Sequence, residues 1–567
     1  MKNPMKQKNS SRSGKLLILM LLFILPACTA SSELTDDTIL LPPDILPGES
    51  PARFVEKSFL MEQIQQLASD AMMGRGTGQK GSRRALEYLE QYYTSDSFSG
   101  FESLPVIRQS FELEGVFWDA ASYDIYSLSV DTVYLSRSKL EKGGTADFFP
   151  LQGGTRAHDA PVVFAGDGLI DVSDQDLQSV RSTLQHAWVM VFEPDPDGNG
   201  SRSAKVQKMV TEFGATGVIF IPDRDAESWE KKSKKMSRQL ERPTIVRRPG
   251  GRPATTGGSL GASVSVHPYM AARILDLDNP AQLDSLRHYW RSNTSTTIAH
   301  DTGFRFASTP VMNTRLFEED NLITIIPGNH PELSREMVVL SAHYDHMGLG
   351  EPDDNYDIVY SGADDNASGT AVLMQIARAF HKAAGDGYYP SRTLVFLHAA
   401  AEEWGLYGAR YFVENPLFPD HEIVVNVNVD MVGSVDDSYS GRQDSSYIHV
   451  IGAGLVSTML DDLLQMANDA TVDLILDEVY NDTGHYLQLY RRSDHWAFAL
   501  KNIPFVFFFS GLHEHYHRPS DTHEKIAASL LAARTELITE LVWYLAEVKE
   551  RPESDRRQFG RARAPAR

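Results

Sequence analysis

Four nearly continuous apolar runs in the C-terminal half of the chain constrain its fold most strongly. They cover residues 337–342, 393–397, 423–429 and 504–509. Because the runs do not alternate with polar residues, we expect buried parallel strands with helices packed on both faces. Helical patterns separate the runs, notably over 369–382. The sequence therefore predicts an α/β fold with a mostly parallel mixed sheet flanked by helices.

At or shortly after the end of each run comes a residue of the kind that binds metal ions. In chain order these residues are His343 with Asp345, Glu402 with Glu403, Asp430 and His517. In open α/β sheets ligands bind beyond the carboxyl ends of the strands, so the fold would gather these side chains at one sheet edge. Such His, Asp and Glu side chains can bind zinc, and the single cysteine of the chain excludes a cysteine-rich site.

Each motif taken alone also has a purely structural interpretation. Asp364 and Asp365 could cap the helix that follows them, because hydrogen-bond acceptors suit a helix N-terminus. Glu402 and Glu403 could form a solvated helix start. Asp430 is different, because a carboxylate directly after an apolar strand is expected to be partly buried and to need a partner. The convergence of all the motifs on one predicted sheet edge favours a metal site.

Five segments, in this order, resemble family 28 of the metallopeptidases, the zinc exopeptidases that include aminopeptidases S and Y and glutamate carboxypeptidase. The segments are 341–345 (SAHYD), 361–369 (SGADDNASG), 401–408 (AEEWGLYG), 428–433 (NVDMVG) and 516–522 (YHRPSDT). The resemblance covers roughly residues 321–548, and no proposed ligand position departs from the family pattern. It implies a zinc exopeptidase-like fold and hydrolysis of peptides.

The resemblance also implies a ligand set for two Zn²⁺ ions per chain. One zinc would bind His343 and Asp430, the other would bind Glu403 and His517, and Asp365 would bridge both. The two ions carry a charge of about +4 and the three carboxylates about −3, so the pocket keeps a net positive pull on a hydroxide and on a substrate carbonyl.

Further roles follow from the same resemblance. Glu402 would be the general base that takes a proton from the attacking water and passes it to the leaving amine. Asp345 would orient His343 through the second ring nitrogen of the imidazole. Tyr516 matches the tyrosine of the family that stabilises the oxyanion.

Several other residues near these positions could be mistaken for ligands. His346, His513 and His515 lie close to the proposed ligands in the sequence. We prefer His517 because it lies in a Tyr-His-x-Pro-x-Asp pattern, and His343 because it lies nearest the strand end. For Asp494 we expect an N-cap of the helix that runs towards residue 500.

The N-terminus resembles a bacterial lipoprotein signal peptide. A basic start precedes an apolar run over 16–25, which is too short to span a bilayer, and Leu25-Pro26-Ala27-Cys28 resembles a lipobox. We expect cleavage after residue 27 and a lipid anchor on Cys28 that holds the protein on a membrane. By resemblance to enterobacterial lipoprotein sorting, Thr29 after the cysteine favours the outer membrane of the cell envelope. The net charge of −22 argues against a nucleic-acid partner.

The body of the chain divides into two parts by composition. We expect a flexible spacer at 28–53, a zinc peptidase domain at 54–144 and 269–549, and a disordered tail at 550–567. Residues 145–268 alternate short β-rich runs with a helical stretch, which predicts an inserted small α/β domain. This insert resembles the protease-associated domain, particularly over 205–221.

The substrate is expected to be a peptide, and the favoured activity is that of an aminopeptidase. A carboxypeptidase of the same family is the alternative, and an acidic-substrate carboxypeptidase would need an arginine cluster, for which Arg491 and Arg492 are candidates. A non-catalytic surface binding protein on this scaffold is a third hypothesis, although here every ligand position is retained. The terminal-residue specificity, native metal and oligomeric state stay open.

Overall fold

The computed structural model describes most of the chain after residue 49. The described residues are 50–95, 98, 104–128, 132–141, 143–152, 157–167, 180–194, 202–222, 226–250, 262–292, 299–353, 355–442 and 446–560. The predicted signal peptide and nearly all of the predicted spacer lie outside them. Within these ranges, no helix combines the length and apolar character needed to cross a bilayer.

The four predicted strands lie next to one another in the sheet. They are β10 (Glu336–His343), β13 (Thr393–Ala399), β14 (Glu422–Val429) and β17 (Phe505–Phe509). The order is β17-β14-β10-β13, and all three neighbouring pairs are parallel. Their carboxyl ends therefore meet at one edge. Antiparallel strands β15 (Tyr447–Gly452) and β9 (His300–Ile326) flank this group, so the sheet is mixed.

Helices cover both faces of these central strands. Helices α8 (Gly369–Gly385) and α12 (Ala528–Glu547) pack with α1 (Lys57–Leu67), whereas α9 (Tyr407–Glu414) and α11 (His495–Ala499) pack on each other. The second pair shares a core cluster with Val339, and Val338, which points to the other face, is also fully buried. The predicted α/β fold class is thus confirmed.

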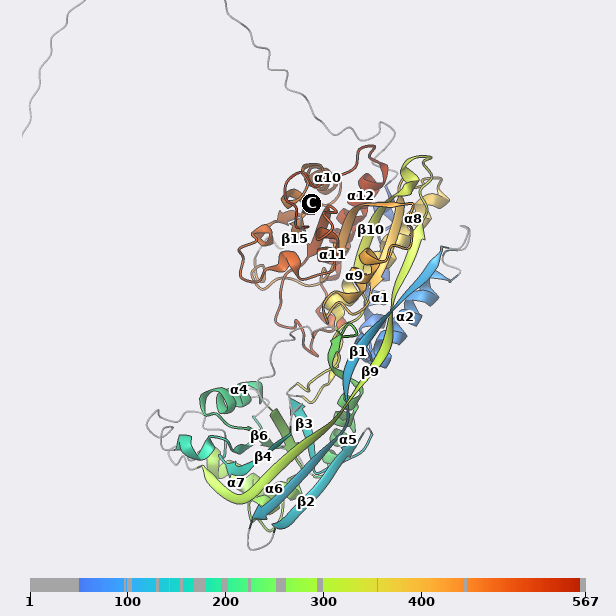
Figure 1. The fold of residues 1–567 in the computed structure, drawn as a ribbon. Helices are drawn as coiled ribbons and strands as arrows, with labels where there is room; N and C mark the ends of the chain where they lie inside the picture. Colours follow the sequence, from blue (N-terminus) through green and yellow to red (C-terminus); the bar gives the residue numbers. More distant parts are fainter. Residues whose placement is uncertain are drawn as a thin grey trace, which may run out of the picture. The chain divides into compact units, whose positions relative to one another are not determined.

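Two long strands connect this region with the rest of the described chain. Strands β1 (Val106–Leu128) and β9 pair antiparallel, from Val106 opposite Thr324 to Ser127 opposite Phe304. Figure 1 shows the two strands side by side, with α1 and α2 (Lys80–Tyr93) near one end of the pair and β2 (Thr132–Glu141) near the other. Each strand therefore belongs to both parts of the fold.

The second part of the fold continues the same sheet beyond β9. From β9 outward come β4 (His158–Phe164), β5 (Trp188–Phe192), β6 (Gly217–Ile221), β8 (Ala262–Val266) and β3 (Phe148–Gln152). Beside these strands β7 (Pro243–Arg247) pairs with β1. Helices α4 (Arg202–Gln207), α5 (Ala226–Ser237), α6 (Pro268–Ile274) and α7 (Ala281–Ser292) complete this part.

The core of this second part reaches beyond the predicted insert. The cluster that contains Trp188 and Phe220 also contains Trp118 and Phe306 from the two long strands, and Met270 from α6. It further includes residues 349, 356, 358 and 359, from the segment between the first and second metal motifs. The predicted domain boundaries at 145 and 268 stay a prediction, but the apolar packing does not stop at them.

Described residues of the predicted spacer and of the predicted tail contact the rest of the fold. Residues 51–54 form a short 3₁₀ helix, preceded by Ser50, whose hydroxyl donates to Glu540 on α12, so the end of the predicted spacer is docked. In the predicted tail, the ring of Phe559 lies 5.2 Å from that of Trp496, and the amide of Gly560 donates to Asn502 at 2.7 Å. Local contacts of this kind leave little signal in a polar, arginine-rich sequence.

Glu319 on β9 gives the fold a pH-dependent contact. Its buried carboxylate accepts hydrogen bonds from the amide of Gly78 at 2.6 Å and the hydroxyl of Ser82 at 3.1 Å, which tie β9 to the start of α2. Burial raises the pKa of Glu319 from 4.5 to about 8. The folded protein therefore holds this proton more tightly than the unfolded chain does.

We expect the stabilising effect of this proton to be complete below about pH 4.5 and lost as the pH rises through about 8. Glu319→Gln keeps an acceptor without a charge. The difference in the free energy of unfolding, variant minus wild type, should therefore be more positive at pH 8.5 than at pH 5. Urea unfolding at both pH values measures this, with the exposed neighbour variant Glu318→Gln as the control. A difference between Glu319→Gln and wild type that does not change with pH would contradict the assignment.

Candidate active site

The predicted metal-binding side chains come together at the carboxyl edge of the central strands. His343 is the last residue of β10, and Asp430 directly follows β14. Asp365 lies in the turn before α8, and Glu403 lies in the turn between β13 and α9. His517 comes from the loop after β17. Although these residues are distant in sequence, parallel strand order places all of them at one edge.

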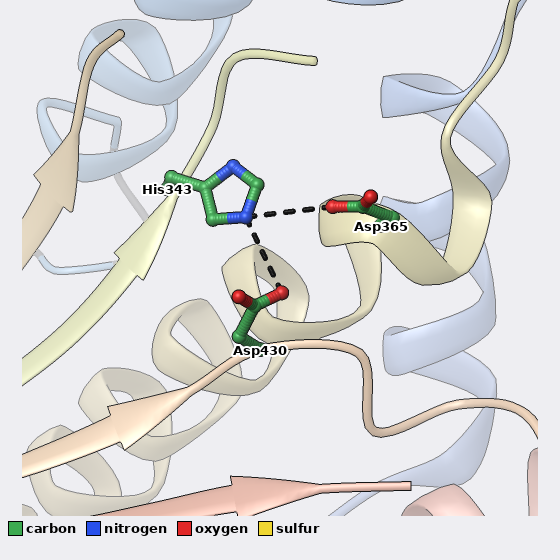
Figure 2. Close-up of side chains that lie close together, drawn as sticks. All are labelled: His343, Asp365 and Asp430. Carbon is green, nitrogen blue, oxygen red and sulfur yellow. Dashed lines mark hydrogen bonds and ion pairs between the residues drawn. The ribbon is translucent and has the colours of Figure 1, made fainter. Parts of the chain in front are cut away.

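The first group consists of His343, Asp365 and Asp430 (Figure 2). The Nε2 atom of His343 lies 3.3 Å from Oδ1 of Asp430 and 3.5 Å from Oδ1 of Asp365. Figure 2 shows both carboxylates facing this one ring nitrogen. The three side chains are buried, and they could hold a metal ion between them. We refer to them as the first half-site.

The second group uses the other oxygen of Asp365. The Nε2 atom of His517 lies 3.1 Å from Oδ2 of Asp365 and 3.3 Å from Oε2 of Glu403. The Nδ1 atom of His346 lies 2.8 Å from Oε1 of Glu403 and 3.7 Å from Oδ2 of Asp365. We refer to these four residues as the second half-site. Asp365 thus faces both half-sites, one with each carboxylate oxygen.

The position of His346 was not expected from the sequence. Spacing from the strand end favours His343, and the resemblance assigns the other histidine position to His517. In the fold, β10 ends at His343 and the chain turns, so His346 enters the cluster from a second direction. By contrast, His513 binds Asp364 and His515 contacts Ser520, both outside the two half-sites.

His343 is oriented by Asp345, through the backbone carbonyl of that residue. Its Nδ1 lies 3.1 Å from the backbone carbonyl of Asp345, whereas the nearer carboxylate oxygen of Asp345 is 3.9 Å away. A carbonyl only accepts, so Nδ1 donates to it, and Nε2 is the ring nitrogen that faces the first half-site. The Asp345 carboxylate instead accepts from the amide of Glu402 at 3.1 Å and from the hydroxyl of Thr77 at 2.9 Å.

Glu402 lies at the edge of this cluster with 9% of its surface exposed. Burial raises the pKa of Glu402 well above its ordinary value, and the negative charges of Glu403 and Asp430 add to this against the attraction of His343. The helix-start interpretation does not hold, because α9 begins only at Tyr407. Glu402 is therefore a buried acid beside both half-sites and not a solvated surface group.

Tyr516 and Asp494 border the same cluster. The ring of Tyr516 stacks on that of His517 with centroids 3.9 Å apart. Asp494 precedes α11 as predicted, but its side chain makes no capping hydrogen bond. Both of its carboxylate oxygens are buried and have no hydrogen-bond partner among the described residues. Burial raises the pKa of Asp494 to about 7.

Backbone amides and hydroxyls fix the carboxylates of the site. The carboxylate of Asp521 accepts from the amides of Asp364 and Asp365 at 3.0–3.2 Å, which joins the His517 loop to the turn before α8. Ser493 donates to Oδ2 of Asp430 at 2.7 Å. Asp364 does not cap α8, because its Oδ1 accepts from the amide of Gly433 at 2.6 Å.

A buried arginine that the sequence analysis missed holds the loops of the site together. The Arg75 guanidinium donates to five carbonyl oxygens, from residues 67, 344, 361, 362 and 365. It is fully buried, and burial lowers its pKa to about 10. The flanking Gly74 has a φ of +64°, and a Cβ there would lie 2.4 Å from a backbone oxygen. The glycine-rich sequence Arg75-Gly76-Thr77-Gly78 is the signal that could have pointed to this segment.

The electrostatics of the cluster fit divalent cations. Asp345, Asp365, Glu402, Asp430 and Asp494 are all buried, and Glu403 adds a further carboxylate. Burying several carboxylates together is costly unless positive charge balances them. Burial lowers the pKa of His517, yet Glu403 and Asp365 outweigh this and raise it to about 11. Nitrogen and oxygen donors in two groups that share one carboxylate suit paired Zn²⁺ ions.

Comparison with known proteins finds a family match over the segment that contains this cluster. Residues 321–542 match the model of peptidase family M28. Within the curated proteins, aminopeptidase YwaD of Bacillus subtilis is 24% identical over 239 residues, which are 41% of this chain and 45% of YwaD. Leucine aminopeptidase 1 of Fusarium vanettenii is 31% identical over 132 residues, 23% of this chain and 32% of that protein. The chain thus spans less than half the length of these relatives.

Solved structures of aminopeptidases align with this chain at low similarity. The aminopeptidase from Aneurinibacillus sp. strain AM-1 aligns with a TM-score of 0.45 and 18% identity, over 91% of this chain and all of that chain. A zinc aminopeptidase from Bacillus subtilis aligns with a TM-score of 0.45 and 18% identity, over 88% of this chain and 96% of that one.

Arg75 lies outside residues 321–542 but donates hydrogen bonds to carbonyls within them. A substitution of Arg75 therefore tests how much these contacts stabilise the fold. Arg75→Lys keeps the charge but offers a compact ammonium in place of the planar fork, so several buried carbonyls lose their partners. We expect the free energy of unfolding to fall by about 3 kcal/mol or more. The exposed Arg83→Lys on α2 should change it by no more than about 0.5 kcal/mol. Denaturant unfolding of both variants measures the contrast, and equal small effects would refute the role of Arg75.

Proposed function

We propose that the protein is a zinc-dependent exopeptidase that removes N-terminal residues from peptides. One observation carries the proposal: two groups of metal-binding side chains share Asp365 and lie beside the buried acid Glu402. The match of residues 321–542 to peptidase family M28 supports the hydrolase class. The names of the relatives, among them YwaD and leucine aminopeptidase 1, favour an aminopeptidase.

In this proposal the chain binds two Zn²⁺ ions. His343, Asp365 and Asp430 would hold the first, and Asp365, Glu403 and His517 would hold the second. When bound, the ions supply Lewis acidity that activates a water and polarises the scissile carbonyl. The near balance between ligand charge and metal charge explains how so many carboxylates can share one buried edge.

Glu402 is the proposed general base. It lies next to Glu403 in sequence, so one side chain can face the metal while the other faces the reacting water. A carboxylate in this position can accept a proton from the water and return it to the leaving amine. The bond between the Asp345 carboxylate and the Glu402 amide, 3.1 Å long, fixes the backbone at this position.

Tyr516 and Asp345 have supporting roles in the proposal. Tyr516 stabilises the negative charge that develops on the carbonyl oxygen, from its place against the ring of His517. Asp345 acts as a positioning residue, because its carbonyl holds His343 and its carboxylate holds the Glu402 backbone.

The preference for a free N-terminus rests on charge. A free α-amine is a cation, and the cluster is rich in carboxylates, among them those of Glu402, Glu403 and Asp494. Arg491 and Arg492, which would bind a C-terminal carboxylate in a carboxypeptidase, are both exposed. The side chain of Arg491 also donates to Gln488 of its own loop. An arginine pocket built for a carboxylate would be expected to hold its guanidinium groups more firmly.

Initial rates on chromogenic substrates test this function. We expect the soluble protein from residue 31 onward to cleave free-amine aminoacyl anilides, with no cleavage of the N-acetylated forms. Chelation should abolish activity and added zinc should restore it. Glu402→Gln should lower kcat at least about a hundredfold, whereas the exposed Glu514→Gln should not. Cleavage of blocked peptides with a free C-terminus would favour a carboxypeptidase, and no turnover of either class would favour a binding protein.

We further propose that the protein is a lipoprotein of the cell envelope, anchored through Cys28 and facing peptides outside the inner membrane. The basic start, short apolar run and Leu-Pro-Ala-Cys sequence support this. We expect full-length protein to label with fatty acid and to sediment with membranes. Cys28→Ser should lose the label and be released by a mild wash, because two acyl chains are needed for stable attachment. Label retained in Cys28→Ser would contradict the proposal.

A further inference from the structure

We propose that His346 is a metal ligand of the second half-site through its Nδ1 atom. The second metal would then have four protein ligands, His346, Glu403, His517 and Asp365, whereas the first would have three. This inference rests on the two-metal function proposed above and adds to it an asymmetry between the two metals.

The distances at the second half-site fit a shared metal. Zinc bonds of about 2.0–2.1 Å in a tetrahedral arrangement place neighbouring ligand atoms roughly 3.3 Å apart. The Nε2 atom of His517 meets this with Asp365 at 3.1 Å and with Glu403 at 3.3 Å. The Nδ1 atom of His346 lies 3.7 Å from the same oxygen of Asp365. The rings of His346 and His517 have their centroids 5.8 Å apart and approach Glu403 and Asp365 together.

The pocket around His346 is built for its ring. The side chain is fully buried, and its amide donates to the carbonyl of Arg75 at 3.3 Å. A Cβ on Gly362 would lie 2.4 Å from Cδ2 of the imidazole, so only glycine at that position leaves space for the ring. The other ring nitrogen, Nε2, is buried and has no hydrogen-bond partner among the described residues. The polar contacts of the ring are therefore made at Nδ1, the atom that faces the half-site.

A second role would also place Nδ1 near Glu403. The 2.8 Å separation from Oε1 of Glu403 is a hydrogen-bond distance, so a protonated Nδ1 could simply orient that carboxylate. The two roles differ in the state of one atom, because a ligand needs the lone pair of Nδ1 and a donor needs its proton. An asparagine at 346 separates them. Its amide nitrogen occupies the position of Nδ1 and donates a hydrogen bond, but it is a poor zinc ligand.

The first half-site lacks a counterpart of His346. In the described part of the chain, its group consists of His343, Asp365 and Asp430. Zinc sites with four protein ligands are typically structural and closed, and those with three keep a position open for water or substrate. We therefore expect the second metal to be held more tightly, and the first to exchange more readily and to carry the open position next to Glu402.

Metal affinity measures this directly, without relying on catalysis. Metal-free wild type, His346→Ala and His346→Asn would be loaded with Zn²⁺ and titrated with a competing chelator, and native mass spectrometry would count the bound ions. We expect wild type to lose its ions in two separate steps. In both variants the tight step should weaken more than about a hundredfold, which exceeds the range typical of an outer-shell partner. His515→Asn, from the His517 loop but outside both half-sites, is the matched control and should keep both steps.

X-ray absorption gives a second readout, because it reports the imidazoles bound per zinc. Wild type should show three imidazoles shared by two ions, and each His346 variant should show one fewer. Tight binding retained in His346→Asn but lost in His346→Ala would overturn the inference in favour of a hydrogen-bond role, and retention in both would also overturn it. Thermal unfolding of the metal-free proteins identifies any variant that fails to fold, and the other variant then decides.

A different set of results would refute the proposed function. Wild type that binds two ions but hydrolyses no peptide would refute the peptidase and leave the ligand assignment standing. Wild type that binds no zinc in the presence of a folded second half-site would refute both.

Discussion

Five carbonyl oxygens from three separate segments converge on the buried guanidinium of Arg75. They belong to the end of α1, to the turn after β10 and to the turn before α8. The last two segments carry His343, His346 and Asp365, so this one contact fixes the spacing between both half-sites and the N-terminal helices. A buried cation surrounded by carbonyl dipoles also offsets part of the negative charge that the metal ligands concentrate nearby.

The carboxyl edge of the four central strands suits a metal site. Parallel strands end together at one edge of the sheet. The side chain at or after each strand end lies next to a loop there, so its polar groups are available to bind a ligand. Buried carboxylates at such positions cost free energy unless cations balance them, and a shared Asp365 would let two cations be held with few ligands. Glu402 and Glu403 differ in their environments. The attraction of His343 does not offset the burial of Glu402, so the pKa of Glu402 stays well above its ordinary value, whereas Glu403 lies between His346 and His517.

Much of this arrangement could be predicted from the sequence. The four apolar runs predict four adjacent parallel strands, because continuous burial has a clear signature, and the strand ends then place the ligands. His346 could not be assigned in this way, since the turn after β10 decides where its ring points. Arg75 was missed because its partners are backbone atoms distant in sequence. The sequence could not show which atom of Asp345 contacts His343, because the contact is made by a backbone carbonyl, which every residue has.

The second part of the fold is connected to the site by apolar packing. Tyr356 and Val359, between His346 and Asp365 in the chain, belong to the core cluster that contains Trp188 and Trp229. The ring of Tyr356 lies 6.3 Å from that of Phe149. The segment that joins two metal-site residues is thus anchored in the second core, which helps to explain why one sheet runs through both parts.

The central claim is that two metal ions share Asp365, one in each half-site. A crystal grown with zinc and measured on both sides of the zinc absorption edge tests this most directly. We expect two anomalous peaks, one between His343 and Asp430 and one between Glu403 and His517, with Asp365 in contact with both. A single peak, or none within the cluster, would contradict the account.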